Sequence, residues 1–384
     1  MKKIIAVVLL AALGVFSFFS VQYIMDSDLF KSFPEAEYLS EDEAAGNVMY
    51  DTLNKKEKAV YTALYRGIIE HKKHIDLPFD IEGEMYEKIY TILEKQESEL
   101  FYIDYAFYVA EKIRRAQIDF NTNEKETASK MLEIEKKRDK ILADVDKKWT
   151  AEEKAKYIHD YLTKNCRYVI EYNRFNGTAY GCLVEGEARC EGYAKAFDYL
   201  MEALGVRTVV ITGTTDEGEA HAWNKFEGSD GKWYNVDVTW DDNDGIEEGN
   251  HCYFMSSGEA FYKTHTPNDV YADENLIFNS KEYSGSGKNY YYKMNKLYAT
   301  DEEDAKEILA REIADYNDKK KYMEIEFADS KLYDKFIKKY FTDGEIVDVI
   351  AEENPELIKD EKYNSFSIME NKDENIIVFY PIKR

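Results

Sequence analysis

The chain has 384 residues, which is long enough for two or three domains. Its composition is 44% hydrophobic and 15% aromatic, enough to build packed cores, and this excludes a disordered polymer. The formal net charge of −25 argues against nucleic acid as a partner, because phosphate binding needs clustered Lys and Arg. We therefore expect a folded protein of several domains that binds no nucleic acid.

Residues 1–25 predict a targeting segment, either a signal anchor or a signal peptide. Two lysines precede an uncharged stretch from Ile4 to Met25, and two aspartates follow it. The stretch is long enough to cross a bilayer, and its flanking charges favour a cytoplasmic N-terminus with an exported body. A cleaved signal peptide is the alternative, although no small-residue cleavage site stands out. We expect either a single-pass membrane protein with an extracytoplasmic body, or a secreted protein.

The segment 39–148 predicts a mainly helical N-terminal region. Residues 53–71 carry apolar side chains at intervals that match one helix face, and the charged residues 123–149 predict a long exposed helix. Thr150 and Glu153 then form a T-x-x-E capping pattern, which predicts that a new helix opens the next region, 149–266.

The last segment, 267–384, predicts a small α/β domain. We expect helices at 301–318 and 331–341, and the final two strands predict a terminal hairpin. The expected strands are 288–299, 321–328, 364–370 and 375–383.

Cys190 stands directly before an amphipathic helix. The apolar residues that follow it are spaced as one helix stripe, and Gly205 is a suitable C-terminal cap. Cys190 therefore lies at the first helical turn, where unpaired backbone N–H groups and the helix dipole stabilise a thiolate. The same N–H groups can hold a developing oxyanion.

His221 and Asp237 fall on two predicted strands that flank the turn-rich residues 227–231. Their numbers are symmetric about Ser229, so we expect the two residues to lie opposite, or nearly opposite, each other in a hairpin. A carboxylate there would fix the imidazole tautomer while the other ring nitrogen meets Cys190. Cysteine at a helix start and histidine beside Trp are usually core residues when each stands alone. Taken together, Cys190, His221 and Asp237 favour a catalytic triad.

The remaining cysteines, Cys166, Cys182 and Cys252, lie in the same middle region as Cys190. If Cys190 stays free, at most one disulfide can form among the other three. We therefore expect no disulfide framework, with these three as free or buried thiols.

The sequence around these three residues resembles the transglutaminase-like (papain-fold) superfamily, particularly its exported bacterial members. The similarity lies in TAYGCLVEGEARCEGYAKAFDYLMEALGV, HAWN and WYNVDVTWDD, and it covers roughly Trp149 to His265. It implies an α+β papain-like core, in which a cysteine at a helix N-terminus packs on an antiparallel sheet that carries histidine and aspartate. The resemblance also implies that Cys190 is the nucleophile, His221 the base and Asp237 the orienting carboxylate.

This resemblance implies a cysteine enzyme that acts on peptide or Gln side-chain amides through a thioester. Water as acceptor would make it a protease or amidase, which we expect, and an amine acceptor would make it a cross-linking transglutaminase. A non-catalytic cell-surface binding module is the other alternative. The expected substrate is a protein or peptide, cell-wall peptide included. We also expect the N-terminal segment to bind the membrane. We expect no cofactor and no metal. The acidic loop 241–248 could bind calcium by composition, but it fails the EF-hand pattern, so calcium binding is only an alternative there.

Overall fold

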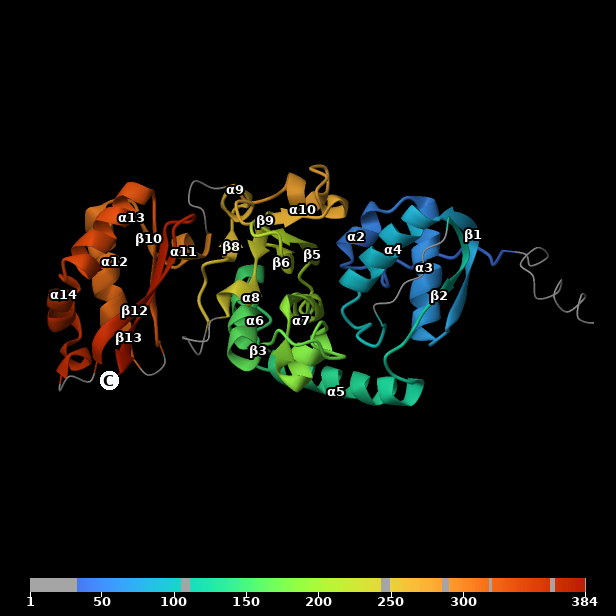
Figure 1. The fold of residues 1–384 in the computed structure, drawn as a ribbon, viewed down its shortest axis with the longest axis horizontal. Helices are drawn as coiled ribbons and strands as arrows, with labels where there is room; N and C mark the ends of the chain where they lie inside the picture. Colours follow the sequence, from blue (N-terminus) through green and yellow to red (C-terminus); the bar gives the residue numbers. More distant parts are fainter. Residues whose placement is uncertain are drawn as a thin grey trace, which may run out of the picture.

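The computed structural model describes residues 33–104, 111–242, 249–284, 290–317, 320–359 and 363–383. The predicted targeting segment, residues 1–25, lies outside them. None of the helices in the described part of the chain is both long and apolar enough to span a membrane. The described segments follow one another along the long axis, with the central body between the N-terminal and C-terminal ones (Figure 1).

The N-terminal segment is mainly helical, and it also contains a two-stranded antiparallel sheet that the sequence analysis did not predict. Its long charged helix runs from this segment along the central body (Figure 1). Its elements are α2 (Val48–Thr52), α3 (Lys55–Ile69), β1 (His74–Glu82), α4 (Gly83–Gln96), β2 (Lys112–Gln117) and α5 (Glu124–Leu142).

Helices and an antiparallel sheet form the central body. The predicted capping box is present, because the Thr150 side chain accepts from the Glu153 N–H and Glu153 accepts from the Thr150 N–H. The first elements are α6 (Ala151–Asn165), β3 (Arg167–Tyr168), a π-helical turn (Gly181–Glu185), β4 (Glu187–Ala188) and α7 (Cys190–Ala203). The sheet and its connections follow as β5 (Thr208–Thr215), β6 (Ala220–Glu227), β7 (Trp233–Val236), α8 (Val238–Asp241), β8 (Phe254–Ser256), α9 (Gly258–Phe261), β9 (His265–Pro267), a 3₁₀ turn (Asp269–Tyr271) and α10 (Ile277–Ser280).

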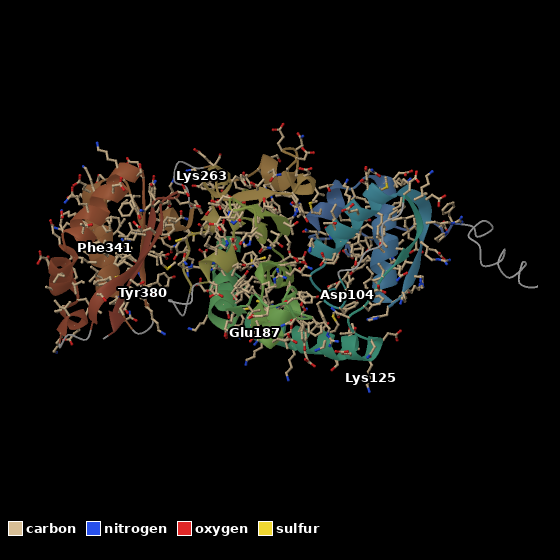
Figure 2. All side chains as sticks on the ribbon, viewed as in Figure 1. Asp104, Lys125, Glu187, Lys263, Phe341 and Tyr380 are labelled. Carbon is tan, nitrogen blue, oxygen red and sulfur yellow. The ribbon has the colours of Figure 1, made fainter. Side chains whose placement is uncertain are left out.

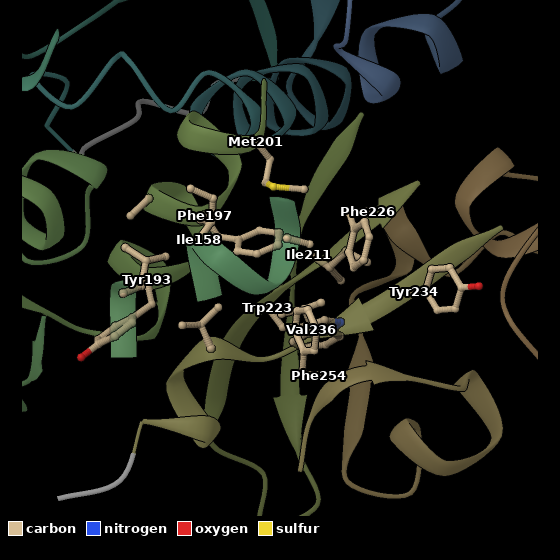
Figure 3. Close-up of a cluster of buried hydrophobic side chains, with 14 of the residues drawn as sticks. Ile158, Tyr193, Phe197, Met201, Ile211, Trp223, Phe226, Tyr234, Val236 and Phe254 are labelled. Carbon is tan, nitrogen blue, oxygen red and sulfur yellow. The ribbon is translucent and has the colours of Figure 1, made fainter. Parts of the chain in front are cut away.

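The central sheet has the order β8-β7-β6-β5-β9, and its neighbouring strands are antiparallel. Helix α7 packs its apolar stripe on this sheet, where Phe197 and Met201 meet Ile211 and Phe226 (Figure 3). A cysteine-bearing helix packed on an antiparallel sheet is the α+β papain-like arrangement that was expected.

The β6–β7 hairpin differs from its predicted register. Asn224 pairs with Val236, so Asp237 is the residue diagonal to His221 rather than its direct partner. Strand β7 ends at Val236, and Asp237 is the N-cap of α8 instead of a strand residue. Glu227 pairs with Trp233, which centres the turn on Asp230 instead of Ser229. The two residues therefore lie nearly opposite, one of the two placements expected, and not directly opposite.

The C-terminal segment contains a four-stranded sheet with the order β10-β11-β13-β12, covered by helices. The predicted strand at 288–299 was wrong over most of its length, since 290–294 are helical and only a two-residue strand follows. The elements are α11 (Tyr290–Met294), β10 (Tyr298–Ala299), α12 (Glu302–Asp315), β11 (Met323–Phe327), α13 (Ser330–Phe336), a π-helical stretch (Ile337–Thr342), α14 (Ile346–Glu353), a 3₁₀ turn (Pro355–Leu357), β12 (Tyr363–Asn371) and β13 (Ile376–Lys383).

The terminal hairpin of β12 and β13 is confirmed. Its inner side chains complete the C-terminal core, where Phe341 packs edge-on against Phe379 with ring centroids 5.2 Å apart. Phe341 and Tyr380 mark this segment in Figure 2.

Two contacts cross the expected domain limits. The limit at 266/267 falls inside β9, and the Tyr283 N–H still donates to the Trp233 carbonyl of the central sheet. On the other side, the buried Gln96 amide of α4 pairs with both backbone groups of Val210 in β5. The division into domains stays a prediction, and the structure places the central sheet in contact with the segments before and after it.

Candidate active site

Cys190 opens helix α7 at the edge of a cleft. Its preceding residue, Arg189, is extended, so the chain turns into the helix at the cysteine itself. Gly192 in the same turn packs so closely that a Cβ atom there would lie 2.5 Å from the Asn176 carbonyl oxygen. The thiol is therefore held at a helix N-terminus, where the helix dipole favours negative charge.

His221 lies near the start of β6 between Cys190 and Asp237. Its Nε2 lies 2.6 Å from Asp237 Oδ2, and the imidazole also hydrogen-bonds the Cys190 side chain. Burial lowers the pKa of His221, but the Asp237 charge and the hydrogen bonds to Asp237 and Cys190 outweigh this and raise it to about 10. The imidazolium form is thus stabilised beside the thiol.

Asp237 is fully buried and its carboxylate is saturated with donors. Oδ1 accepts from the backbone N–H groups of Thr239 and Trp240, at 3.0 and 3.2 Å. Burial raises the pKa of Asp237, but the charges and hydrogen bonds of His221 and His265 hold it well below its usual range. The structure thus brings together the three residues singled out from the sequence.

His265 is a fourth member of the cluster that the sequence analysis missed. Its Nε2 lies 3.1 Å from Asp237 Oδ2, the oxygen that also meets His221. The buried ring stacks on Phe261 with centroids 3.9 Å apart, and Nδ1 lies 2.9 Å from Thr264 Oγ1. Its strand, β9, has only three residues, so no periodic pattern pointed to it.

A cleft of about 430 Å³ opens over Cys190 and His221. Residues of three segments line it: Thr91 and Lys95 from α4, Tyr172 and Asn176 from the loop before α7, and Thr212, Gly213 and Asn268 around the end of β5. A second cavity of about 640 Å³ also borders His221 and is lined by Tyr168, Trp240, Asp216, Glu217 and Glu219. The imidazole therefore borders two cavities.

The four cysteines differ in exposure. All are free, and only Cys190 is more than marginally accessible to solvent. Burial raises the pKa of Cys182 and of Cys252 well above the usual thiol range, with neighbouring Cys166 adding to the effect at Cys182. This agrees with the expectation of free or buried thiols and leaves Cys190 as the reactive candidate.

The acidic loop 241–248 lies mostly outside the described residues. Asp241, at its start, is buried and already bonded: Oδ2 lies 3.1 Å from His159 Nε2, and Oδ1 accepts from the Tyr253 N–H. Both carboxylate oxygens of Asp241 therefore have partners within the protein.

Comparison with known proteins gives one family match, in which residues 139–238 match the model of the transglutaminase-like superfamily. Comparison with curated proteins gave no match. Among solved structures, a TGase aligns at 16% identity over 35% of this chain and 43% of its own, with a TM-score of 0.26. A candidate cysteine protease from Cytophaga hutchinsonii aligns at 19% identity over 28% and 36%, with a TM-score of 0.23.

Menin, solved to reveal its binding site for the Mixed Lineage Leukemia protein, aligns at 14% identity over 79% of this chain and 63% of its own, with a TM-score of 0.28. The chain thus spans less than half of the TGase and the Cytophaga protein, and less than two thirds of menin. The family match covers α7, the β5–β7 sheet and all three residues of the expected triad. Residues 139–238 of this chain therefore form a domain of the transglutaminase-like superfamily.

Proposed function

We propose that the protein is a cysteine acyl-transfer enzyme that hydrolyses peptide or Gln side-chain amides. The observation that carries the proposal is the contact chain from Cys190 through His221 to Asp237 on the wall of an open cleft. A protonated imidazole beside a thiol at a helix N-terminus favours the thiolate, which is the nucleophilic form.

In the proposed reaction the Cys190 thiolate attacks the amide carbonyl carbon. The N–H groups at the start of α7 stabilise the oxyanion that forms, and the C–N bond then breaks as His221 gives its proton to the leaving amine. The product is a thioester on Cys190. Water attacks this thioester with His221 accepting its proton, which releases a carboxylic acid and restores the thiolate.

Asp237 acts through His221 in this scheme. Its single oxygen Oδ2 holds Nε2–H of the imidazole, which leaves the other ring nitrogen directed to the sulfur. We further propose a protein or peptide substrate outside the cytoplasm, cell-wall peptide included. The support for this location is the uncharged stretch Ile4–Met25 with its flanking charges.

Mass spectrometry of peptides containing Gln and Lys tests the proposal. The full chain should cleave a peptide or convert Gln to Glu, and Cys190→Ala should abolish the product. Cys252→Ala, at a buried cysteine, is the matched control and should retain activity. Detection of peptides joined with loss of ammonia would show that the enzyme cross-links its substrates instead of hydrolysing them. Equal turnover by Cys190→Ala would contradict the mechanism.

A further inference from the structure

A second buried cluster lies where α6 meets the C-terminal segment. His159 and His251 stack with ring centroids 4.9 Å apart, and both are at most 1% exposed. Asp160 Oδ1 lies between them, 3.1 Å from His159 Nδ1 and 2.9 Å from His251 Nε2. The sequence analysis predicted no metal ligand here, because His251 lies 91 positions after Asp160 and the three residues match no ligand motif.

The outer nitrogen of each ring meets another buried carboxylate. His159 Nε2 lies 3.1 Å from Asp241 Oδ2, and His251 Nδ1 lies 3.1 Å from Glu324 Oε1, with the Tyr322 hydroxyl also 3.1 Å away. Histidines that bind metals usually donate their other ring N–H to a carboxylate or carbonyl in this way. Both rings therefore have the orientation of metal ligands, with the inner nitrogens converging on one oxygen.

A divalent cation would fit between the two inner nitrogens, His159 Nδ1 and His251 Nε2. Each neutral imidazole offers one lone pair for a cation and one N–H for a hydrogen bond. With the inner nitrogens bound to the ion, the outer N–H groups would donate to Asp241 and Glu324.

The spacing of the donor atoms fits a small cation. Tetrahedral zinc bonds of about 2.0–2.1 Å separate neighbouring ligand atoms by about 3.3 Å. The two measured separations of 2.9 and 3.1 Å differ from this by a few tenths of an ångström, and all three ligand atoms lie within 4.8 Å of one another. Asp160 also borders a cavity of about 590 Å³, which gives an ion an entry path and water a fourth position.

The surrounding charges balance such an ion. Lys156 Nζ lies 2.5 Å from Asp160 Oδ2, the oxygen that faces away from the imidazoles. Lys156 and a divalent cation together carry as much positive charge as Asp160, Asp241 and Glu324 carry negative charge. Two imidazole nitrogens and one carboxylate suit zinc, whereas calcium and magnesium prefer all-oxygen sites.

We propose that His159, Asp160 and His251 bind one zinc ion that fixes the C-terminal segment to the catalytic body. Glu324 belongs to β11 of that segment, and its carboxylate also accepts from the hydroxyls of Tyr291 and Tyr292. On the other side Asp241 ends α8, the helix capped by Asp237. The ion would therefore join α6, the loop around His251 and, through Glu324, the C-terminal sheet.

The other cluster with suitable donors is His221, Asp237 and His265. There both imidazoles direct Nε2 to the same oxygen, and the His221 imidazole also hydrogen-bonds the Cys190 side chain. Binding zinc in that cluster would occupy the groups that the proposed catalysis uses. An experiment can therefore distinguish which of the two clusters binds zinc.

Zinc titration of the chelator-treated full chain, followed by calorimetry and by elemental analysis after dialysis, tests the proposal. We expect one zinc per chain, with affinity reduced at least a hundred-fold in His251→Gln and in Asp160→Asn. His74→Gln, at an exposed histidine of β1, and His221→Gln should bind as the wild type does. Circular dichroism on each variant, with labelling of Cys190 on all variants except His221→Gln, checks that the fold survives.

Cobalt as a probe adds an independent readout. We expect visible absorption bands of four-coordinate cobalt without the near-ultraviolet charge-transfer band of a cobalt–thiolate bond, and loss of these bands in His251→Gln. A thiolate band, or loss of binding in His221→Gln with retention in His251→Gln, would place the ion at the catalytic cluster and overturn the proposal. Absence of any zinc binding, or wild-type binding by a folded His251→Gln, would do the same.

Discussion

His265 Nε2 and Asp237 Oδ2 lie 3.1 Å apart, and this carboxylate oxygen is the one that also receives His221 Nε2 at 2.6 Å. Two imidazoles therefore share one oxygen, while the backbone of α8 holds the other. The carboxylate cannot rotate without breaking bonds on both sides. His265 is a positioning residue by this geometry, since it bonds Asp237 and is not itself one of the residues that line the cleft.

Replacement of His265 by Gln should lower amidase turnover roughly ten- to a hundred-fold, because a hydrogen bond to a charged group contributes about 1.5–3 kcal/mol. Substrate binding should change little, so the loss should fall on kcat rather than KM. The measurement is steady-state kinetics with the peptide substrate found for the wild type. His74→Gln serves as control, and a KM effect alone would contradict the positioning role.

Alkylation of Cys190 should report the protonation of His221. Wild-type His221 keeps its proton until the pH rises through about 10, so the imidazolium supports the thiolate throughout the neutral range. His221→Gln removes this support and leaves only the N-terminus of α7, so we expect the Cys190 thiol to react with iodoacetamide roughly ten-fold or more slowly at pH 7. The difference between the alkylation rates of the two proteins should narrow above pH 10, where wild-type His221 loses its proton. Equal alkylation rates at pH 7 would refute the ion pair.

Gln96→Ala should loosen the contact between α4 and the central sheet. The Gln96 amide donates to the Val210 carbonyl at 2.7 Å and accepts from its N–H at 3.2 Å, so the variant leaves two buried backbone groups unpaired. The expected loss is about 1–3 kcal/mol in the free energy of unfolding, measured in urea. Gln117→Ala, at the half-buried end of β2, is the comparison and should cost less than half as much.

Gly213→Ala should disturb β9 and, with it, His265. A Cβ atom at residue 213 would lie 2.0 Å from the Thr266 carbonyl oxygen and 2.7 Å from the Trp223 ring. Backbone cannot yield as a flexible side chain does, so we expect destabilisation of roughly 1–3 kcal/mol and reduced turnover. Thermal unfolding and kinetics check this against Thr214→Ala, and an unaffected Gly213→Ala would show that β9 can shift freely.

Local patterns predicted the parts of the site that depend on local structure. The apolar stripe after Cys190 and the capping pattern at Thr150 correspond to α7 and α6, since both signals arise within a few turns of one helix. The proximity of His221 and Asp237 followed from hairpin symmetry, even though the register was shifted. The exact register was not readable, because the turn-rich residues 227–231 fit more than one turn centre, and the pairing of Glu227 with Trp233 places the centre at Asp230.

The parts of the site and fold that local patterns did not predict depend on contacts between residues distant in the sequence. His265 reaches Asp237 only because three-residue β9 pairs with the end of β5, and pairing partners of so short a strand leave no trace in the sequence. The tyrosine-rich 290–294 has strand-forming residues but is helical, because Tyr291 and Tyr292 direct their hydroxyls to Glu324. Contacts across about thirty residues decided the conformation there.

The pairing of Gln96 with Val210 bears on how much of the chain is needed for a working cleft. Thr91 and Lys95, in the last two turns of the same helix as Gln96, line the cleft over Cys190, although they precede the superfamily match by more than forty residues. Residues 139–238 expressed alone would hold the triad but would have an open-sided groove and a bare sheet edge at Val210. Such an excised domain should accept amides that the intact chain rejects and should tend to self-associate along that edge.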